Sequence, residues 1–322
     1  MKHEWNPWTA RNWSATREEW DNADLPLVTL GVLNYNRRIE LRQTLDVLTR
    51  AVQYPRYEIL VVDNGSTDGS IEMVRREYPS VVLHEVGQNL GVSARNVEFE
   101  LARGKYLFTF DDDTCPGTPA MVLRIVQHME ANPDIAVLST SYYQPVNGLM
   151  ETIGWEYYRL SADSNRGFKG IFIVEGGVCF RISTLRKVGG YDPAWPGQEG
   201  MELGLRFLKH GYDIVFCPWF LTLHFYAASG RPHGRRSYVN SRQTIWMIAK
   251  HWPIIVAIPM LLLLVIRRTV GMVMHPETAL QNAKGLVAGF IGMPHFLSMY
   301  PKLTWRQVLC LSRFYLFLFR WG

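Results

Sequence analysis

Three consecutive aspartates, Asp111 to Asp113, directly follow the apolar stretch Tyr106–Phe110. Adjacent carboxylates repel one another and lose solvation when partly buried, so a divalent cation or a hydrogen-bond donor would stabilise them. Hard cations such as Mg²⁺ take oxygen ligands and usually keep waters and substrate phosphates in their coordination shell. An acidic turn in solvent is the alternative. The place of the triplet at the end of a predicted strand favours a metal and nucleotide site.

Two more polar clusters follow apolar stretches of the same kind. Asn34–Asn36 comes after Val28–Leu33, and Asp63–Ser66 comes after Glu58–Val62. The Asn-Gly pair inside the second cluster indicates a turn. Asp63, at the predicted strand tip, is suited to accept hydrogen bonds from a nucleobase. The three clusters together indicate a ligand-binding edge.

The elements that carry these clusters alternate between strands and amphipathic helices. Strands are predicted at 28–33, 58–62, 80–85, 105–110 and 135–141, and helices at 37–53, 70–77, 92–102 and 119–131. Repeated βαβ units indicate an α/β fold with a mainly parallel sheet and helices on both faces. Ligands of such sheets gather beyond the carboxyl ends of the strands, where all three clusters fall. Arg95, on the helix after Gly91, could reach a phosphate from there, and a surface salt bridge is the alternative.

Four motifs, in this order, resemble those of family 2 glycosyltransferases. They are Leu33–Arg37, Val61–Asp68, Asn89–Gly91 with Ala94–Asn96, and Phe110–Asp113. The resemblance covers residues 26 to 250. It implies a Rossmann-like GT-A fold, an inverting mechanism, and a nucleotide-diphosphate sugar as donor of a hexosyl or related group.

The resemblance also implies roles for single residues. Asp63 is similar to the carboxylate that recognises the base, and Asp113 is similar to the ligand of a Mg²⁺ or Mn²⁺ cofactor. His224 resembles a distal histidine that often completes the metal shell, although a histidine after an apolar strand is otherwise more often structural. The residues expected to bind the sugar donor are Asn34, Asn36, Arg37, Asp63, Asn64, Ser66, Asn89, Arg95, Asp111 and Asp112.

The sequence departs from the family pattern where the general base is expected. Family members usually place two acids shortly before a Leu-Gly-Leu-Arg helix, and the second acid is the base. Here that position is Gly200, so Glu199 becomes the favoured base. Glu202 is expected to cap the helix or form a salt bridge, and Asp192, in a second segment that resembles the family, is a further catalytic candidate. Gly200 leaves a catalytically impaired sugar-nucleotide-binding protein as one alternative, and a metal-dependent nucleotidyltransferase is another.

The composition changes after Phe225. This last third carries 12 Lys and Arg but a single acid, Glu277, within a chain of net charge +5. Its longest uncharged run, Pro253–Ile266, is shorter than the roughly 20 residues that a spanning helix needs. Further apolar stretches contain Arg, Trp and Tyr. We expect helices that lie in an anionic membrane interface, and the alternative is a helical subdomain or an oligomer contact.

Three parts are therefore predicted. They are a Trp-rich arm at 1–25, a GT-A glycosyltransferase domain at 26–228, and a basic, apolar helical region at 229–322. The expected acceptor is a lipid-linked or cell-surface glycan, with a role in polysaccharide biosynthesis. Four scattered cysteines favour a reducing compartment, and the predicted location is the cytoplasmic face of the cell membrane. Nucleic acid is not an expected partner, because the acidic catalytic half would repel its phosphates.

Overall fold

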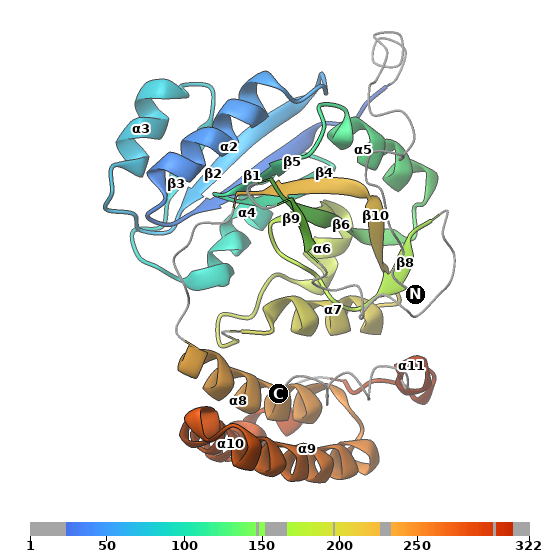
Figure 1. Ribbon diagram of the computed structural model, residues 1–322. Coiled ribbons are helices and arrows are strands. Elements are labelled where there is room, and N and C mark those ends of the chain that lie inside the picture. The colour runs from blue at the N-terminus through green and yellow to red at the C-terminus, as the bar shows by residue number, and fades with distance from the viewer. Residues whose placement is uncertain are drawn as a thin grey trace. The chain divides into compact units, whose positions relative to one another are not determined.

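The computed structural model describes residues 24–145, 148–151, 166–195, 197–225, 233–298 and 301–311. The chain divides into two compact units (Figure 1). The first unit holds the described residues up to Tyr191 together with 212–225, and the second holds 192–211 together with those from 233 onward. We predicted from the sequence that residues 192–211 belong to the glycosyltransferase domain, whereas in the structure they are part of the same compact unit as the C-terminal helices. The predicted arm lies almost wholly outside the described residues.

The first half of the first unit is a parallel sheet. Its strands lie in the order β3-β2-β1-β4, as expected from repeated βαβ units. The elements are β1 (Val28–Asn34), α2 (Arg38–Arg50), β2 (Tyr57–Asp63), α3 (Ser70–Glu77), β3 (Val82–Glu85), a 3₁₀ turn (Gly91–Ala94), α4 (Arg95–Leu101) and β4 (Tyr106–Asp111). In register, Asn34 pairs with Asp63 and Leu33 pairs with Asp111. The polar clusters therefore share one edge of the sheet.

Beyond β4 the sheet is mixed rather than mainly parallel, because β9 runs antiparallel between β4 and β6. The remaining elements are β5 (Thr114–Pro116), α5 (Met121–Ala131), β6 (Ile135–Gln144), β7 (Leu149–Glu151), β8 (Phe168–Gly170), β9 (Gly177–Arg181), α6 (Ile182–Val188) and β10 (Asp213–His224). The end of β10 pairs with β5, and His224 lies opposite Thr114. This pairing brings the distal histidine beside the aspartate triplet.

Helices cover both faces of the sheet, as predicted. Figure 1 shows α2, α3 and α5 on one face and α4 and α6 on the other. On α2, Leu41, Leu45 and Leu48 form a buried stripe at helical spacing, and they join a core that includes Val28 and Leu30 of β1. This core fixes the strands whose ends carry the polar clusters.

The second unit is helical among its described residues. It contains α7 (Glu199–Lys209), α8 (His233–His251), α9 (Ile254–Met274), α10 (Pro276–Leu297) and α11 (Trp305–Cys310). The uncharged run predicted to end at Ile266 belongs to a longer helix, because α9 continues through Arg267 and Arg268 to Met274. By length and composition α9 could cross a membrane: it has 21 residues and a mean hydropathy of 2.1, and 22% of its most apolar window is buried. Arginine is a good helix former, so two of them do not end the helix.

Candidate sugar-donor site

The first part of the site joins the loops after β1 and β2. Asn34 Nδ2 donates to Asp63 Oδ2 at 2.7 Å and to Ser66 Oγ at 3.0 Å. Asp63 Oδ1 accepts the backbone N–H groups of Gly65 and Ser66, at 3.1 and 2.7 Å. Gly65 has a φ of +84°, and a Cβ there would lie 2.8 Å from the backbone of Gln88, so only glycine fits this turn. Asp63 is thus held in place at the strand tip, where it was predicted to face a base.

A further feature of this edge is a buried hydrogen-bond acceptor, the side-chain oxygen of Asn34. Asn34 Oδ1 is buried and has no hydrogen-bond partner among the described residues. Buried polar atoms are nearly always hydrogen-bonded, so an unpaired one in this place calls for a ligand. An N–H group of a nucleobase would satisfy it. Asn36, which has a φ of +53°, accepts the N–H of Thr67 at 2.7 Å and ties the same two loops together.

Asn64 and Asn89 build the neighbouring loop. Asn64 Nδ2 donates to Asn89 Oδ1 and to the carbonyl of Gly91, each at 3.1 Å. Asn64 Oδ1 accepts the N–H of Leu90 at 2.8 Å. Both side chains therefore hold the loop before α4, and they contribute to the site by shaping that loop.

Arg95 does not reach the surface. Its side chain is fully buried, where it pairs with Asp111 and lies 3.3 Å from both carboxylate oxygens of Glu98. Nη1 also donates to the carbonyl of Phe110 at 3.1 Å. Arg95 has no exposed atoms for a phosphate, so neither the predicted phosphate contact nor a surface salt bridge is supported. It instead fixes Asp111 at the edge of the sheet.

Glu98 is a part of the site that the sequence reading missed. It is fully buried beneath β1, and a Cβ on Gly31 would lie 2.9 Å from its Oε2 atom. Burial raises the pKa of Glu98 to about 7, although the adjacent Arg95 opposes this shift. The sequence contained one signal for this pair. Arg95 and Glu98 are three residues apart on a short helix that begins after the apolar Ala94, a spacing at which side chains can pair.

Two of the three aspartates contact a second arginine, Arg37. Arg37 Nη1 lies 3.1 Å from Asp112 Oδ1 and 2.5 Å from Asp113 Oδ2. Asp112 is buried and also accepts the N–H of Tyr35 at 3.2 Å. Its burial raises its pKa to about 7, while Arg37 lowers it and the flanking aspartates raise it. Asp111 is more exposed and faces the opposite way, toward Arg95.

Asp113 and His224 fit a shared cation. Asp113 Oδ1 lies 3.6 Å from His224 Nε2, and the N–H of Phe225 donates to the Asp113 carbonyl at 2.8 Å, which fixes the end of β10 beside the triplet. No group of three His, Cys, Asp or Glu side chains comes together as a complete metal site in the described part of the chain. Mg²⁺ is usually bound through one or two carboxylates plus substrate phosphates. Asp113 supplies one such carboxylate, and the His224 imidazole lies close enough to share the same cation.

The two catalytic candidates belong to the second unit. Asp192 Oδ2 accepts from Lys250 Nζ at 3.0 Å, and its Oδ1 accepts from the N–H of Ala194 at 3.0 Å. Both of its oxygens are thus engaged in hydrogen bonds within the second unit. Glu199 opens α7, where its Oε1 accepts the N–H of Gly197 at 2.5 Å. Glu202 forms the predicted salt bridge, with Arg206 Nη2 at 2.9 Å.

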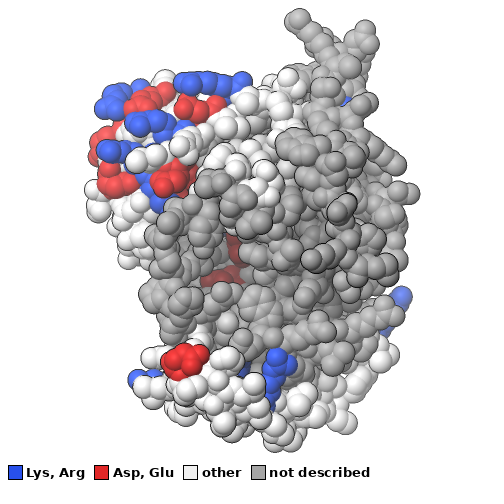
Figure 2. All heavy atoms as spheres, viewed as in Figure 1, with Lys and Arg blue, Asp and Glu red and all other residues white. Residues whose placement is uncertain are grey.

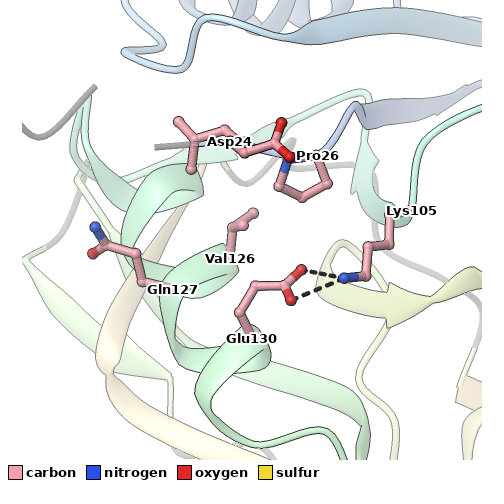
Figure 3. Close-up of a pocket in the computed structure, with 7 residues that line it drawn as sticks. Asp24, Pro26, Lys105, Val126, Gln127 and Glu130 are labelled. Atoms are coloured by element: carbon pink, nitrogen blue, oxygen red, sulfur yellow. Dashed lines mark hydrogen bonds and ion pairs between the residues drawn. The ribbon is translucent and has the colours of Figure 1, made fainter. Parts of the chain in front are cut away.

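A cavity of about 510 Å³ lies away from this edge (Figure 3). It sits beside the N-terminal ends of β1 and β4, where Lys105 and Glu130 form an ion pair at 2.6 Å. Ligands of parallel sheets bind at the carboxyl ends. The cavity contains none of the predicted site residues and is not the sugar-donor site.

The curled α/β sheet with an aspartate-rich edge is a GT-A-like glycosyltransferase fold. A solved mannosyltransferase from Pyrobaculum calidifontis, in complex with GDP-Man and Mn²⁺, has the same fold, with a TM-score of 0.56, 19% identity, and coverage of 97% of this chain and 92% of that one. The model of glycosyl transferase family 2 matches residues 29–189. The chain therefore belongs to glycosyl transferase family 2.

Two curated relatives extend this comparison. A validoxylamine A glucosyltransferase from Streptomyces hygroscopicus subsp. limoneus is 32% identical over 226 residues, 59% of this chain and 50% of the relative. The succinoglycan biosynthesis protein ExoA from Rhizobium meliloti is 26% identical over 213 residues, 58% of this chain and 59% of the relative. Among the curated relatives, the match spans from 24% to 59% of their own lengths.

Proposed function

We propose that the protein is an inverting, metal-dependent glycosyltransferase that moves a hexosyl or related sugar from a nucleotide-diphosphate donor to a hydroxyl of a lipid-linked or cell-surface glycan. The observation that carries the proposal is the edge of the sheet. There Asp113 and His224 lie 3.6 Å apart, beside an arginine and an unpaired buried acceptor. The solved mannosyltransferase of the same fold holds a sugar nucleotide and Mn²⁺.

The edge has separate places for the two ends of the donor. The base would meet Asn34 Oδ1 and Asp63, because these oxygens accept hydrogen bonds and are rigidly held. The diphosphate would lie near Arg37, whose guanidinium already neutralises Asp112 and Asp113. A Mg²⁺ or Mn²⁺ ion on Asp113 and His224 would supply a Lewis acid for the departing diphosphate. Arg37 would supply further positive charge.

The transfer step needs a base in addition. The acceptor oxygen forms a bond to the anomeric carbon as the bond to the diphosphate breaks on the opposite side, which inverts the configuration. Glu199 is the proposed base that takes the acceptor proton, a role that contributes about 10² to 10⁴-fold. Its place in the first turn of α7 is next to Gly200, the position of the family base.

Isosteric replacement of the proposed metal ligand tests this function. We expect Asp113→Asn to abolish transfer and to remove the thermal stabilisation that GDP or UDP gives with Mn²⁺, because ligand binding stabilises only the folded state. Asp46→Asn, a half-exposed helix aspartate paired with Arg50, is the matched control. Transfer at the wild-type rate by a folded Asp113→Asn protein would contradict the proposal.

A second function deserves a test because of Gly200. If Glu199 cannot act as a base, the protein would bind the sugar nucleotide without turnover. Stabilisation of the wild type by a nucleoside diphosphate and Mn²⁺, together with no transfer and no hydrolysis of any sugar nucleotide in a panel, would favour this sugar-nucleotide-binding role.

The acceptor side of the proposal rests on the second unit. In α9 the residues Ala257, Met260, Leu264 and Arg268 form one buried stripe, and many of the other apolar side chains, such as Ile255, Leu262 and Ile266, are exposed. Figure 2 shows Lys, Arg, Asp and Glu side chains gathered over α2 and α3 of the first unit. A helix packed on protein along one side and apolar along the other is suited to lie in a membrane interface. The basic surplus of this region favours anionic lipid at the cytoplasmic face.

Charge placed on the exposed face of α9 tests the membrane contact. Leu262 and Ile266 are 62% and 61% exposed, so Leu262→Glu with Ile266→Glu should release the protein from anionic vesicles without unfolding it. Ile39→Glu, at a 63% exposed position in the first unit, is the control. Equal flotation of both proteins with phosphatidylglycerol vesicles would rule out this face as the contact.

A further inference from the structure

Lys250, near the end of α8, is a buried lysine that the sugar-donor site does not explain. Its side chain is almost completely buried, which is rare for lysine unless the ammonium is paired. Nζ lies 2.8 Å from Glu202 Oε1 and 3.0 Å from Asp192 Oδ2. It also lies 5.0 Å from the centre of the Trp195 ring, in a cation–π arrangement. One ammonium thus joins three points of the segment that leads into α7.

These points bracket the proposed base. Asp192 and Trp195 precede the turn at Gly197–Glu199, and Glu202 follows it in the first turn of α7. The two carboxylates that Lys250 contacts are therefore on either side of Glu199 in the chain. The position of Glu199 is set by how firmly this clamp holds both ends of the turn.

The turn itself has an unusual backbone. Gln198 is left-handed, with a φ of +58°, a conformation that non-glycine residues rarely adopt. Gly197 has a φ of +94°, and a Cβ on it would lie 2.3 Å from Val239 of α8. The side chain of Gln198 donates to Thr244 of α8 at 3.3 Å. Such a backbone persists only where its surroundings hold it, and it is concentrated at functional sites.

Several cations surround the two carboxylates that Lys250 contacts. Arg206 Nη2 lies 2.9 Å from Glu202 Oε2, and Lys209 interacts electrostatically with both Glu202 and Lys250. His251 Nε2 lies 3.4 Å from Glu202, but burial lowers the pKa of His251 to about 3, which leaves it neutral. Without Lys250, Asp192 and Glu202 would lose an ammonium that contacts both of them in a buried place. Removal of this lysine should therefore loosen the segment from Asp192 to Glu202.

We propose that Lys250 is a positioning residue for sugar transfer: through Asp192, Trp195 and Glu202 it fixes the turn that presents Glu199 to the acceptor. This inference rests on the proposed function, in which Glu199 is the base. Lys250 itself touches no substrate in this scheme. Its loss should slow the transfer step and leave the binding of the nucleotide unchanged, since every residue proposed to bind the sugar donor belongs to the first unit.

The test compares Lys250→Met and Asp192→Asn with the exposed control Lys284→Met in the full chain. We expect both cluster variants to lose kcat for transfer by about 100-fold, the loss that a misplacement of about 1 Å can produce. The acceptor KM and the Kd for GDP or UDP with Mn²⁺ should stay within about twofold. Lys250→Arg, which keeps the charge, should recover part of kcat. A purely structural role would instead lower the melting temperature and the amount of active protein, with normal kcat per folded molecule.

The outcomes separate this inference from the proposed function. If the wild type transfers sugar and the folded cluster variants keep its kcat, the positioning role is overturned. If Lys250→Met does not fold, Asp192→Asn decides, because it removes one partner of the ammonium at a partly exposed position. If the wild type binds the nucleotide but transfers no sugar, the proposed function fails, and with it the basis for a positioning role.

Discussion

The buried pair of Arg95 and Glu98 should make the stability of the protein depend on pH in a direction opposite to that of an ordinary surface carboxylate. Burial raises the pKa of Glu98 from 4.5 to about 7. Its partner Arg95 also forms an ion pair with Asp111. A carboxyl group whose pKa is higher in the folded state binds its proton more tightly there. Its contribution to the free energy of unfolding is therefore fully present below pH 4.5 and is lost as the pH rises through 7.

The size of the effect follows from the shift. A change of one pKa unit corresponds to 1.36 kcal/mol, so the full contribution of Glu98 is about 3 kcal/mol, of which about 2.5 kcal/mol is lost between pH 5 and pH 8. Glu98 is fully buried, so solvent screening does not reduce this figure. Glu98→Gln keeps the shape and the hydrogen-bonding capacity of the neutral form and cannot titrate.

Urea unfolding of the wild type and of Glu98→Gln at pH 5, 6, 7 and 8 measures the effect. All other titrating groups are common to both proteins, so they cancel in the difference. We expect the wild type to lose about 2.5 kcal/mol relative to the variant across this range. Parallel curves, with a constant offset between the two proteins, would show that Glu98 does not titrate there and would refute the reasoning.

Three further predictions concern the edge of the sheet. Arg37→Met should lower the melting temperature without metal and increase the stabilisation by Mn²⁺, because the metal ion would then replace the lost positive charge beside Asp113. An unchanged response of the melting temperature to Mn²⁺ would contradict this prediction. His224→Asn should raise the Mn²⁺ concentration for half-maximal activity by at least about tenfold, the smaller of the losses seen when a metal site loses a supporting group; an unchanged titration would exclude this ligand. Gly31→Ala should lower the free energy of unfolding by about 1 to 3 kcal/mol, because its Cβ would meet the carboxylate of Glu98 at 2.9 Å; denaturant titration measures it, and no loss would mean that Glu98 moves aside.

The edge of the sheet was predictable because it follows from local pattern and a general rule. Apolar stretches ending in Asn34, Asp63 and Asp111 indicated strands, and parallel strands end at one edge. The family resemblance added the distant His224, whose place beside Asp113 depends on the pairing of β10 with β5. Spacing alone contains no signal for that contact.

Other features depend on contacts between distant parts of the chain. The burial of Arg95 results from its pairing with Asp111, 16 residues further along. The segment 192–211 belongs to the same unit as the C-terminal helices, and Asp192 and Glu202 in it contact Lys250, about 50 residues away. Neither segment has a composition that sets it apart. The antiparallel β9 likewise carries no mark of its direction.

The two arginines of the first unit illustrate how position decides the role of a charge. Both lie close to the aspartate triplet, and either could have been chosen from the sequence as a phosphate contact. Arg95 is enclosed and committed to Glu98 and Asp111, whereas Arg37 is partly exposed and shared between Asp112 and Asp113. A ligand can gain from a cation only if the cation can leave its present partners at little cost. Arg37 comes closer to that condition, because its side chain is partly exposed whereas that of Arg95 is fully buried.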